Sequence, residues 1–434
     1  MDRGTLKEKI TGFDAEKEKE KKGCLIFFSA IIVIAAFIFM LVELQGEVIR
    51  DYFYYGDAII NGVLPYEPYN DMNWEYPPLA YLFLAIPRLF ASDPRGYQIA
   101  FIAMTAIFTI IGLCIVRQLS LKYEKNAKVT MSLYTLTVLM LIQFFFDRFD
   151  VIVAIFTLAA VYLYLEKRYT WAFLLLVIGV FVKLYPGLMF PVFLMPFIAD
   201  RDVRGVLKHA GTFIVACVVL MIPFVIWSPD TFLTFVSYHS DRGIQLESMA
   251  ASMILFLEML GLTSVQTVNE YWSFGLSGGA ADLVAPVMML LMILAVLVFC
   301  VAYYIHCKNA GADERYTSPA WASFLIVMIF VIFNKVFSAQ YVVWIMMLLI
   351  PMMMFVNDQN AAKRMYLLFT AVIITTLYFG LMYTGLSYHE PFAVLMLLLR
   401  NILIVVLVVI AMRHTEVMKG PIDAVRKNFG RKTQ

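Results

Sequence analysis

The sequence predicts an all-α protein that crosses a membrane many times. Of its 434 residues, 62% are hydrophobic and only 15% are charged, whereas soluble domains carry about a quarter charged residues. Several apolar runs approach or exceed the roughly 20 residues that a helix needs to cross a bilayer. The five cysteines lie within these runs or at their ends, so the sequence indicates no disulfide framework.

We expect one domain of about twelve transmembrane helices over residues 24–412, between a polar tail at 1–23 and a basic tail at 413–434. The first apolar run is too long for the core of a signal peptide and is expected to stay as an anchor. The expected spans are 24–44, 97–116, 129–146, 149–165, 170–183, 186–199, 206–227, 281–306, 318–333, 339–356, 365–384 and 392–412. Because 170–183 and 186–199 are short and flank prolines, they could instead form one kinked helix and a re-entrant segment.

The basic residues predict how these helices are oriented. With both termini in the cytoplasm, 26 of the 34 lysines and arginines fall on the cytoplasmic side, as the positive-inside rule requires. The apolar stretch 78–90 is too short to cross and is expected to be an interfacial or re-entrant helix. The protein is therefore expected in the plasma membrane, with long external loops at 46–96 and 228–280.

The external side also collects the conspicuous polar residues. The segment Arg50 to Leu79 is acidic and aromatic, and four further segments bring charges to the same side. Charges at the ends of lipid-embedded helices are costly unless they are paired or face water, so five such segments on one side predict a single cavity at the membrane surface. The polar residues expected there are Asp51, Asp57, Asp147, Arg148, Asp150, Lys183, Tyr185, His239, Arg242, Gln245, Glu247, Lys335 and Gln340.

Each of these residues also has a structural interpretation. Asp51 could simply cap a helix that runs to Asn61, with Gly62 as the residue after its end, and Asp57 could be a solvated residue of that helix. Lys183 and Lys335 could reach to lipid head groups. The Asp147, Arg148 and Asp150 group could be an interfacial ion-pair cluster, and the aromatic run at 52–55 could be an interfacial belt.

The sequence lacks the common motifs for binding metals and nucleotides. No HxH or HExxH arrangement appears among the five histidines, so no metal site is expected. No P-loop or GxGxxG follows a strand, and nothing suggests a nucleotide cofactor or a nucleic-acid partner. An activated substrate carried by the membrane itself fits these observations.

Five sequence segments, taken in order, resemble a known family. They are NGVLPYEPYNDMNWEYPPL after Asp51, then FDRFDV, VKLYPGLMFP, YHSDRGIQLES and NKVFSAQYVVW. Together they resemble the polyprenol-phosphate-mannose-dependent mannosyltransferases of the GT-C superfamily, the family of the mycobacterial enzyme that elongates phosphatidylinositol mannosides. The resemblance covers residues 24 to 360. Other GT-C families often place a lysine before the paired prolines, where this chain has Tyr76, which weakens a phosphate-binding role for that motif.

The resemblance implies a fold and a reaction. The fold would be a GT-C-type helical bundle whose long first external loop carries interfacial helices. A hexose, expected to be mannose, would pass with inversion from a polyprenyl or dolichyl phosphate to a hydroxyl of a glycolipid or cell-envelope glycan. No metal or separate cofactor would be needed, because basic side chains can neutralise the departing phosphate.

The resemblance also implies roles for individual residues. Asp51 would be the general base, with Asp57 as the alternative, and His239 would assist. Lys183, Arg242 and Lys335 would bind the donor phosphate. The residues expected to contact substrate are Tyr55, Tyr66, Glu75, Tyr76, Asp147, Arg148, Asp150, Tyr185, Gln245, Glu247 and Gln340.

Two other classes of protein remain as alternatives. A multi-pass lipid transporter or flippase would carry ionisable residues near mid-membrane, and a non-catalytic scaffold would tolerate the loss of Asp51. Apart from Arg400, the interiors of the expected spans are nearly free of charge, while polar residues gather on one side. That distribution favours an enzyme.

Overall fold

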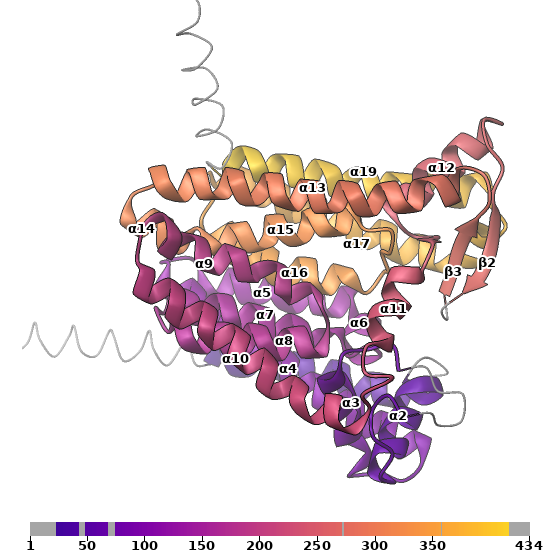
Figure 1. The fold of residues 1–434 in the computed structure, drawn as a ribbon, viewed down its shortest axis with the longest axis horizontal. Helices are drawn as coiled ribbons and strands as arrows, with labels where there is room; N and C mark the ends of the chain where they lie inside the picture. The colour runs from indigo at the N-terminus through magenta and orange to yellow at the C-terminus, as the bar shows by residue number, and fades with distance from the viewer. Residues whose placement is uncertain (1–22, 43–47, 68–73, 271–272, 357, 416–434) are drawn as a thin grey trace, which may run out of the picture.

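The computed structural model describes residues 23–42, 48–67, 74–270, 273–356 and 358–415 (Figure 1). Six helices in this part are long and apolar enough to cross a membrane, which indicates a multi-pass membrane protein. They are Gly23–Leu41, α4 (Pro94–Lys122), α10 (Val203–Trp227), α13 (Ala280–Asn309), α17 (Gln359–Leu381) and α19 (Pro391–His414).

Shorter apolar helices form the interior of the bundle. They are α5 (Ala127–Met140), α7 (Asp150–Leu165), α8 (Tyr169–Val182), α9 (Met189–Ala199), α15 (Pro319–Phe333) and α16 (Tyr341–Met354). At 1.5 Å per residue, a helix of 14 to 16 residues is about 21–24 Å long, shorter than the roughly 30 Å hydrocarbon core. Whether all of them cross the bilayer, as a count of about twelve spans requires, stays a prediction.

The expected span boundaries are close to those of the helices, with one interruption. The run 129–146 is interrupted at Leu141, where α5 ends and the short α6 (Ile142–Phe146) begins. The uncertain pair 170–183 and 186–199 forms two helices, α8 and α9. A 3₁₀ turn, η2 (Tyr185–Leu188), joins them at the proline.

The segment after the first span folds into two short helices. A π-helical turn, η1 (Val48–Tyr52), runs directly into α2 (Phe53–Ile60), and α3 (Pro78–Arg88) occupies the apolar stretch that is too short to cross. Asp51 lies inside the π turn, so it does not cap α2. The capping position is Tyr52, whose side chain makes no cap hydrogen bond. Gly62 follows the end of α2 with φ +89°, a conformation that glycine adopts without strain.

The helical content agrees with the expected all-α membrane protein, and the segment 228–280 adds a small sheet to it. This segment contains α11 (Thr234–Asp241) and α12 (Met249–Met259) together with three short strands, β1 (Ile244–Gln245), β2 (Gln266–Glu270) and β3 (Ser273–Ser277). The strands form an antiparallel sheet in the order β1-β3-β2. Ile244 of β1 and Leu276 of β3 pack into an apolar cluster with Leu397 of α19, so the sheet is attached to the last helix.

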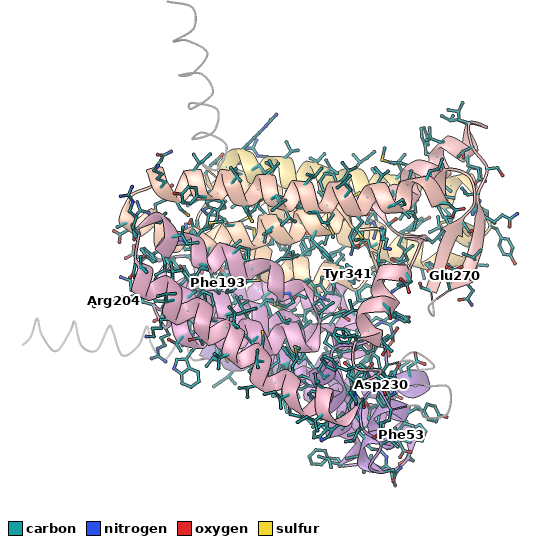
Figure 2. All side chains as sticks on the ribbon, viewed as in Figure 1. Phe53, Phe193, Arg204, Asp230, Glu270 and Tyr341 are labelled. Carbon is teal, nitrogen blue, oxygen red and sulfur yellow. The ribbon has the colours of Figure 1, made fainter. Side chains whose placement is uncertain are left out.

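The short elements of the segments 46–96 and 228–280 gather at one end of the bundle. In Figure 1, α2, α3, α11, β2 and β3 lie at the right-hand end, and the short α14 (Ala312–Thr317) lies at the opposite end. Figure 2 likewise shows Phe53, Asp230 and Glu270 far from Arg204. At the α14 end, Lys122 pairs with Glu166 at 2.8 Å and Arg315 pairs with Asp200.

Candidate functional site

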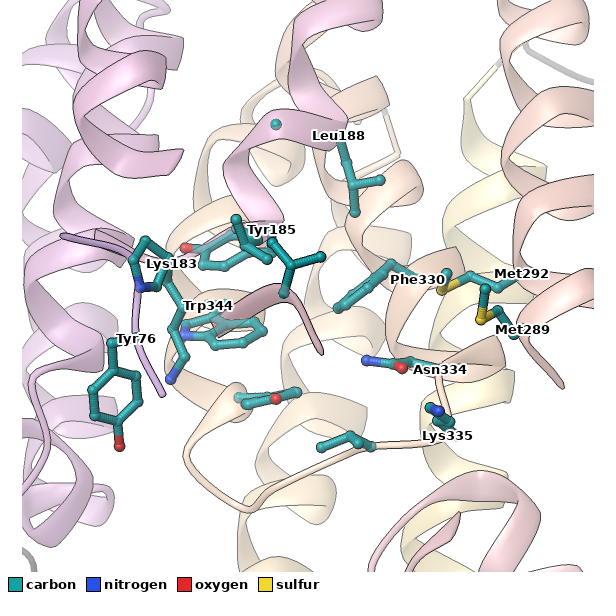
Figure 3. Close-up of a pocket in the computed structure, with 16 residues that line it drawn as sticks. Tyr76, Lys183, Tyr185, Leu188, Met289, Met292, Phe330, Asn334, Lys335 and Trp344 are labelled. Carbon is teal, nitrogen blue, oxygen red and sulfur yellow. The ribbon is translucent and has the colours of Figure 1, made fainter. Parts of the chain in front are cut away.

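A cavity of about 430 Å³ lies where several short helices begin or end (Figure 3). Its walls come from segments that are far apart in the sequence, and most of the lining side chains are apolar or aromatic. The lining residues are Tyr76, Pro77, Lys183, Leu184, Tyr185, Gly187, Leu188, Val236, Met289, Met292, Phe330, Asn334, Lys335, Val336, Tyr341 and Trp344. The cavity therefore combines a large apolar surface with two lysines.

Lys183 is held on one side of the cavity by a buried carboxylate. Helix α8 ends at Val182, and the extended backbone of Lys183 begins the turn into η2. Its Nζ lies 2.7 Å from Oδ1 of Asp150, which is almost fully buried at the first turn of α7. The same oxygen accepts a hydrogen bond of 2.8 Å from Nε1 of Trp344. One carboxylate oxygen thus orients both a cation and an aromatic ring.

A stack of three aromatic rings forms the adjoining wall. The Trp344 ring lies between those of Tyr341 and Tyr185, with centroid distances of 3.7 and 4.1 Å. The ammonium of Lys183 lies 5.0 Å from the centroid of the Trp344 ring and 5.1 Å from that of the Phe149 ring, close enough for cation–π attraction. Asp150 and these rings give Lys183 a defined position.

Lys335 lies on the other side of the cavity, next to Met289 and Met292 of α13 (Figure 3). It belongs to the segment 334–340 between α15 and α16, which we name the cavity loop. Partial burial lowers the pKa of Lys335; Asp241 acts in the opposite direction, and Arg242 adds to the lowering. Its charged form is therefore less favoured here than in water.

Gln245 and Glu247 lie behind the cavity loop and are buried. Gln245 exchanges hydrogen bonds with the loop, and its side chain does not line the cavity. Burial raises the pKa of Glu247 to about 7, although Arg400 and Arg148 nearby lower it. Both residues, expected to contact substrate, support the cavity from behind.

Arg242 lies beside the cavity but does not line it. Its guanidinium donates to Oγ of Ser273 in β3 at 2.5 Å and lies 5.7 Å from the centroid of the Tyr238 ring. Of the three cations expected to bind phosphate, Lys183 and Lys335 face the cavity, and Arg242 is attached to the sheet next to Lys335.

The two carboxylates considered as the base have different surroundings. Asp57 pairs with Arg88 at 2.8 Å and accepts a hydrogen bond from the side chain of Asn61 at 3.2 Å. Asp51 is half-buried and precedes Tyr52, whose ring packs against Phe149 with a centroid distance of 5.5 Å. Because Phe149 also contacts Lys183, Asp51 belongs to the segment next to the cavity wall, while Asp57 is bound to α3.

The remaining expected residues divide into cavity and core positions. Tyr76 and Tyr185 line the cavity. Tyr55 and Tyr66 are buried among other aromatic rings, and the Tyr66 hydroxyl donates to the carbonyl of Tyr76 at 2.8 Å. They hold the Tyr76 segment rather than the cavity surface.

Four further expected residues lie outside the cavity lining. Asp147 and Gln340 do not line it, nor do the half-buried Glu75 and Arg148. The side chain of His239 is outside the described residues.

Trp344 and Tyr341 were not among the residues expected from the sequence. Both lie in the apolar run at the start of α16, where aromatic residues are typical of the core of a membrane protein. Their spacing of three places both side chains on one face of α16, but the face that meets the cavity depends on packing against Asp150 and Tyr185.

The comparison with protein families agrees with this architecture. The family model for glycosyltransferase family 87 matches residues 74–333, which is more than half of the chain and includes Tyr76, Lys183 and the whole polar segment 228–280. No curated protein matches the sequence. The chain belongs to glycosyltransferase family 87, a family of the GT-C type, and is a membrane glycosyltransferase.

Proposed function

We propose that the protein moves a hexose, with mannose as the proposed sugar, from a polyprenyl or dolichyl phosphate to an acceptor hydroxyl with inversion at the anomeric carbon. The observation that carries the proposal is the cavity itself, which places one lysine on each side of a predominantly apolar space. A sugar–phosphate on a long hydrocarbon chain has the same combination of a small anionic group and a large apolar tail.

The walls of the cavity suit such a donor. Leu188, Phe330 and the two methionines of α13 supply apolar contacts for the first isoprene units. Only 6% of the most apolar window of α13 is buried, so this helix has an open apolar face along which a prenyl chain can lie. Lys183 and Lys335 supply the positive charge that a phosphate needs in an apolar surrounding.

In the proposed reaction, Asp51 takes the proton from the acceptor hydroxyl. The hydroxyl oxygen attacks the anomeric carbon from the side opposite the phosphate, and the bond between that carbon and the phosphate oxygen breaks with its electron pair leaving on the phosphate. A carboxylate suits proton removal at hydrogen-bond distance, and the two lysines stabilise the negative charge on the departing lipid phosphate. Asp51 is the preferred base because it precedes Tyr52, whose ring packs against Phe149 beside Lys183, whereas Asp57 is held to α3 by Arg88.

The acceptor is proposed to be a glycolipid or a lipid-linked cell-envelope glycan on the outer face of the plasma membrane. The excess of basic residues on the other side of the expected topology supports this orientation. No metal ion or separate cofactor takes part in the proposed scheme, because the lysines neutralise the leaving group.

The test uses purified protein in lipid vesicles with radiolabelled polyprenyl-phosphate-mannose and membrane lipid extract as the acceptor source. We expect Asp51→Asn to lower transfer by about 10²-fold or more, the range typical of a lost general base. Asp57→Asn, in the adjoining helix α2, is the matched control. It should keep transfer within a few-fold of that of the unchanged protein, and it should lower the melting temperature because the ion pair with Arg88 is lost. Undiminished transfer by Asp51→Asn would overturn the assignment of the base, and no sugar transfer by the unchanged protein from any polyprenyl-phosphate hexose would overturn the proposed donor class.

A further inference from the structure

We propose that Arg400, Gln245 and Glu247 form a positioning unit that fixes the cavity loop and thereby sets the place of Lys335. We name these three residues the clamp. The inference rests on the proposed function in one respect, namely that Lys335 contacts the donor phosphate. Arg400 lies in α19, well beyond the segment that matches the family, so the clamp gives the C-terminal helix a part in the site.

Gln245 holds the cavity loop with both its backbone and its side chain. Its backbone amide donates to the carbonyl of Lys335 at 2.9 Å. Its side-chain oxygen accepts from the amide of Phe337 at 2.7 Å, and its side-chain nitrogen donates to Oγ of Ser338 at 3.1 Å. These bonds give the Gln245 side chain protein partners in the loop, so the residue positions the loop.

Glu247 extends the same contact by one residue. The amide of Ala339 hydrogen-bonds to Glu247, and Tyr383 bonds to its side chain. With Gln245, it attaches four of the five residues from Lys335 to Ala339 to the segment that follows β1. Backbone groups of a buried loop must find hydrogen-bond partners, and the carbonyl of Lys335 and the amides of Phe337 and Ala339 find them here.

Within the clamp, Arg400 holds both Glu247 and the cavity loop in position. It is fully buried, its guanidinium donates to the carbonyl of Glu247, and its Cζ lies 4.2 Å above the centroid of the Phe337 ring. It therefore contacts both Glu247 and the cavity loop. Next to it, Asn401 donates to the carbonyl of Ser248 at 3.1 Å and to Oγ of Ser252 at 2.9 Å, which anchors the start of α12 to α19.

The nature of Arg400 supports a role beyond packing. A guanidinium within an apolar helix is costly and is normally retained for a specific interaction. A leucine or methionine would fill the space between α12 and α19 at lower cost, but it could not bond the carbonyl of Glu247. The arginine therefore provides a hydrogen bond to Glu247, which holds the cavity loop, and a cation–π contact with Phe337 of the loop itself.

The first measurement is independent of the sugar substrate. Hydrogen exchange of the peptide covering 334–340 is compared in the unchanged protein, in Arg400→Met and in the milder Gln245→Leu. We expect faster exchange in both variants. Gln245→Leu removes the acceptor of the Phe337 amide, and Arg400→Met releases Glu247, the acceptor of the Ala339 amide. Exchange should recover in Arg400→Lys relative to Arg400→Met. Arg315→Met, a matched loss of a partly buried arginine at the α14 end, should leave this peptide unchanged.

The second measurement separates positioning from stability. The KM for polyprenyl-phosphate-mannose should rise about tenfold in Arg400→Met, as expected for a displaced binding group, and should not rise in Arg315→Met. In a Lys335→Ala background, Arg400→Met should cause little further rise, because residues that act as one unit are not additive. An unchanged exchange rate, or an Arg400 effect that persists in full without Lys335, overturns the clamp. If the unchanged protein transfers no sugar, the proposed function falls and hydrogen exchange alone decides whether the clamp fixes the loop.

Discussion

Lys183 and Lys335 face one cavity but lie in different surroundings. Lys183 has a buried carboxylate partner at 2.7 Å and three aromatic rings around its ammonium. The pKa of Lys335 is lowered by burial. An anion placed beside Lys335 would favour its charged form and oppose this lowering.

The Lys335 environment predicts how activity depends on alkaline pH. In the free enzyme, Lys335 should lose its proton at a lower pH than an ordinary lysine, and kcat/KM for the donor should fall there. Arginine stays protonated throughout this range, so Lys335→Arg should move the alkaline fall to higher pH. A pH profile of kcat/KM measures both, and an identical profile in the two proteins would contradict the role of Lys335.

The buried pair of Asp150 and Lys183 predicts a large effect on stability. Asp150→Asn leaves the lysine without its counter-charge, and breaking a buried ion pair costs about 3 kcal/mol or more. We expect a marked fall in melting temperature together with lower transfer. The control is Asp358→Asn, which breaks the exposed pair with Arg364 and should cost at most about 1 kcal/mol.

Residue types could be predicted from the sequence more readily than their roles. A single sequence shows that Lys183 precedes a proline turn and that Asp150 begins an apolar run. In the structure, Lys183 lines the cavity and Asp150 pairs with it. The contact of Trp344 with Asp150 joins residues 194 positions apart, and no local pattern indicates such a pair. Packing determines which way the side chains of Tyr66 and Gln245 point, so the sequence alone could not predict that neither lines the cavity.

At the scale of elements, the helices could be predicted from the sequence, whereas the β-sheet and the position of the cavity loop could not. The helices follow from runs of apolar residues, whose length indicates a membrane span. The two residues of β1 are too few for a period of two to be recognised, and β2, with the sequence QTVNE, has no alternation of apolar and polar residues. Their position is set by the contacts of β1 with the cavity loop and of the sheet with α19, both of which are long-range.

Glu247 connects these elements and predicts how their stability depends on pH. Its pKa rises from an ordinary 4.5 to about 7 in the folded protein, with Arg400, Arg148 and Tyr383 around it. The folded state therefore binds the proton more tightly than the unfolded state. The free energy of unfolding is larger in acid, and this contribution is lost as pH rises through 7. Between pH 6 and pH 8 the loss is about 1 kcal/mol.

Thermal unfolding of the purified protein at several pH values tests this effect. The melting temperature should fall between pH 6 and pH 8. Glu247→Gln keeps an acceptor for the amide of Ala339 but has no proton to lose, so it should remove that part of the fall. The same fall in both proteins would show that another group is responsible.

At the scale of the whole molecule, long outer helices surround short inner ones. The inner helices α7, α8, α15 and α16 begin or end at the cavity, and the outer α13 passes beside it. The sequence predicted a multi-pass bundle, with polar residues on one side. The depth of the cavity could not be predicted, because it depends on where each short helix sits relative to its longer neighbours.

The position of α13 predicts an effect of chain length in the donor. Met289→Trp narrows the cavity at the α13 wall and should raise the KM for a long-chain polyprenyl donor more than for a short-chain analogue. Val298→Trp introduces the same ring on the exposed face of α13, away from the cavity lining, and should change neither. Equal effects on the two donors would place the prenyl chain elsewhere.

The exposed face of α13 has a consequence for how fast the enzyme can work. With the proposed donor, both the substrate and the released lipid phosphate stay dissolved in the bilayer and reach the site by diffusing in two dimensions. Turnover would then depend on the mole fraction of donor among lipids and on membrane viscosity, and hardly on the volume of water around the vesicles. Diluting the vesicles at fixed lipid composition should leave the rate per enzyme unchanged, whereas diluting the donor with inert lipid should lower it.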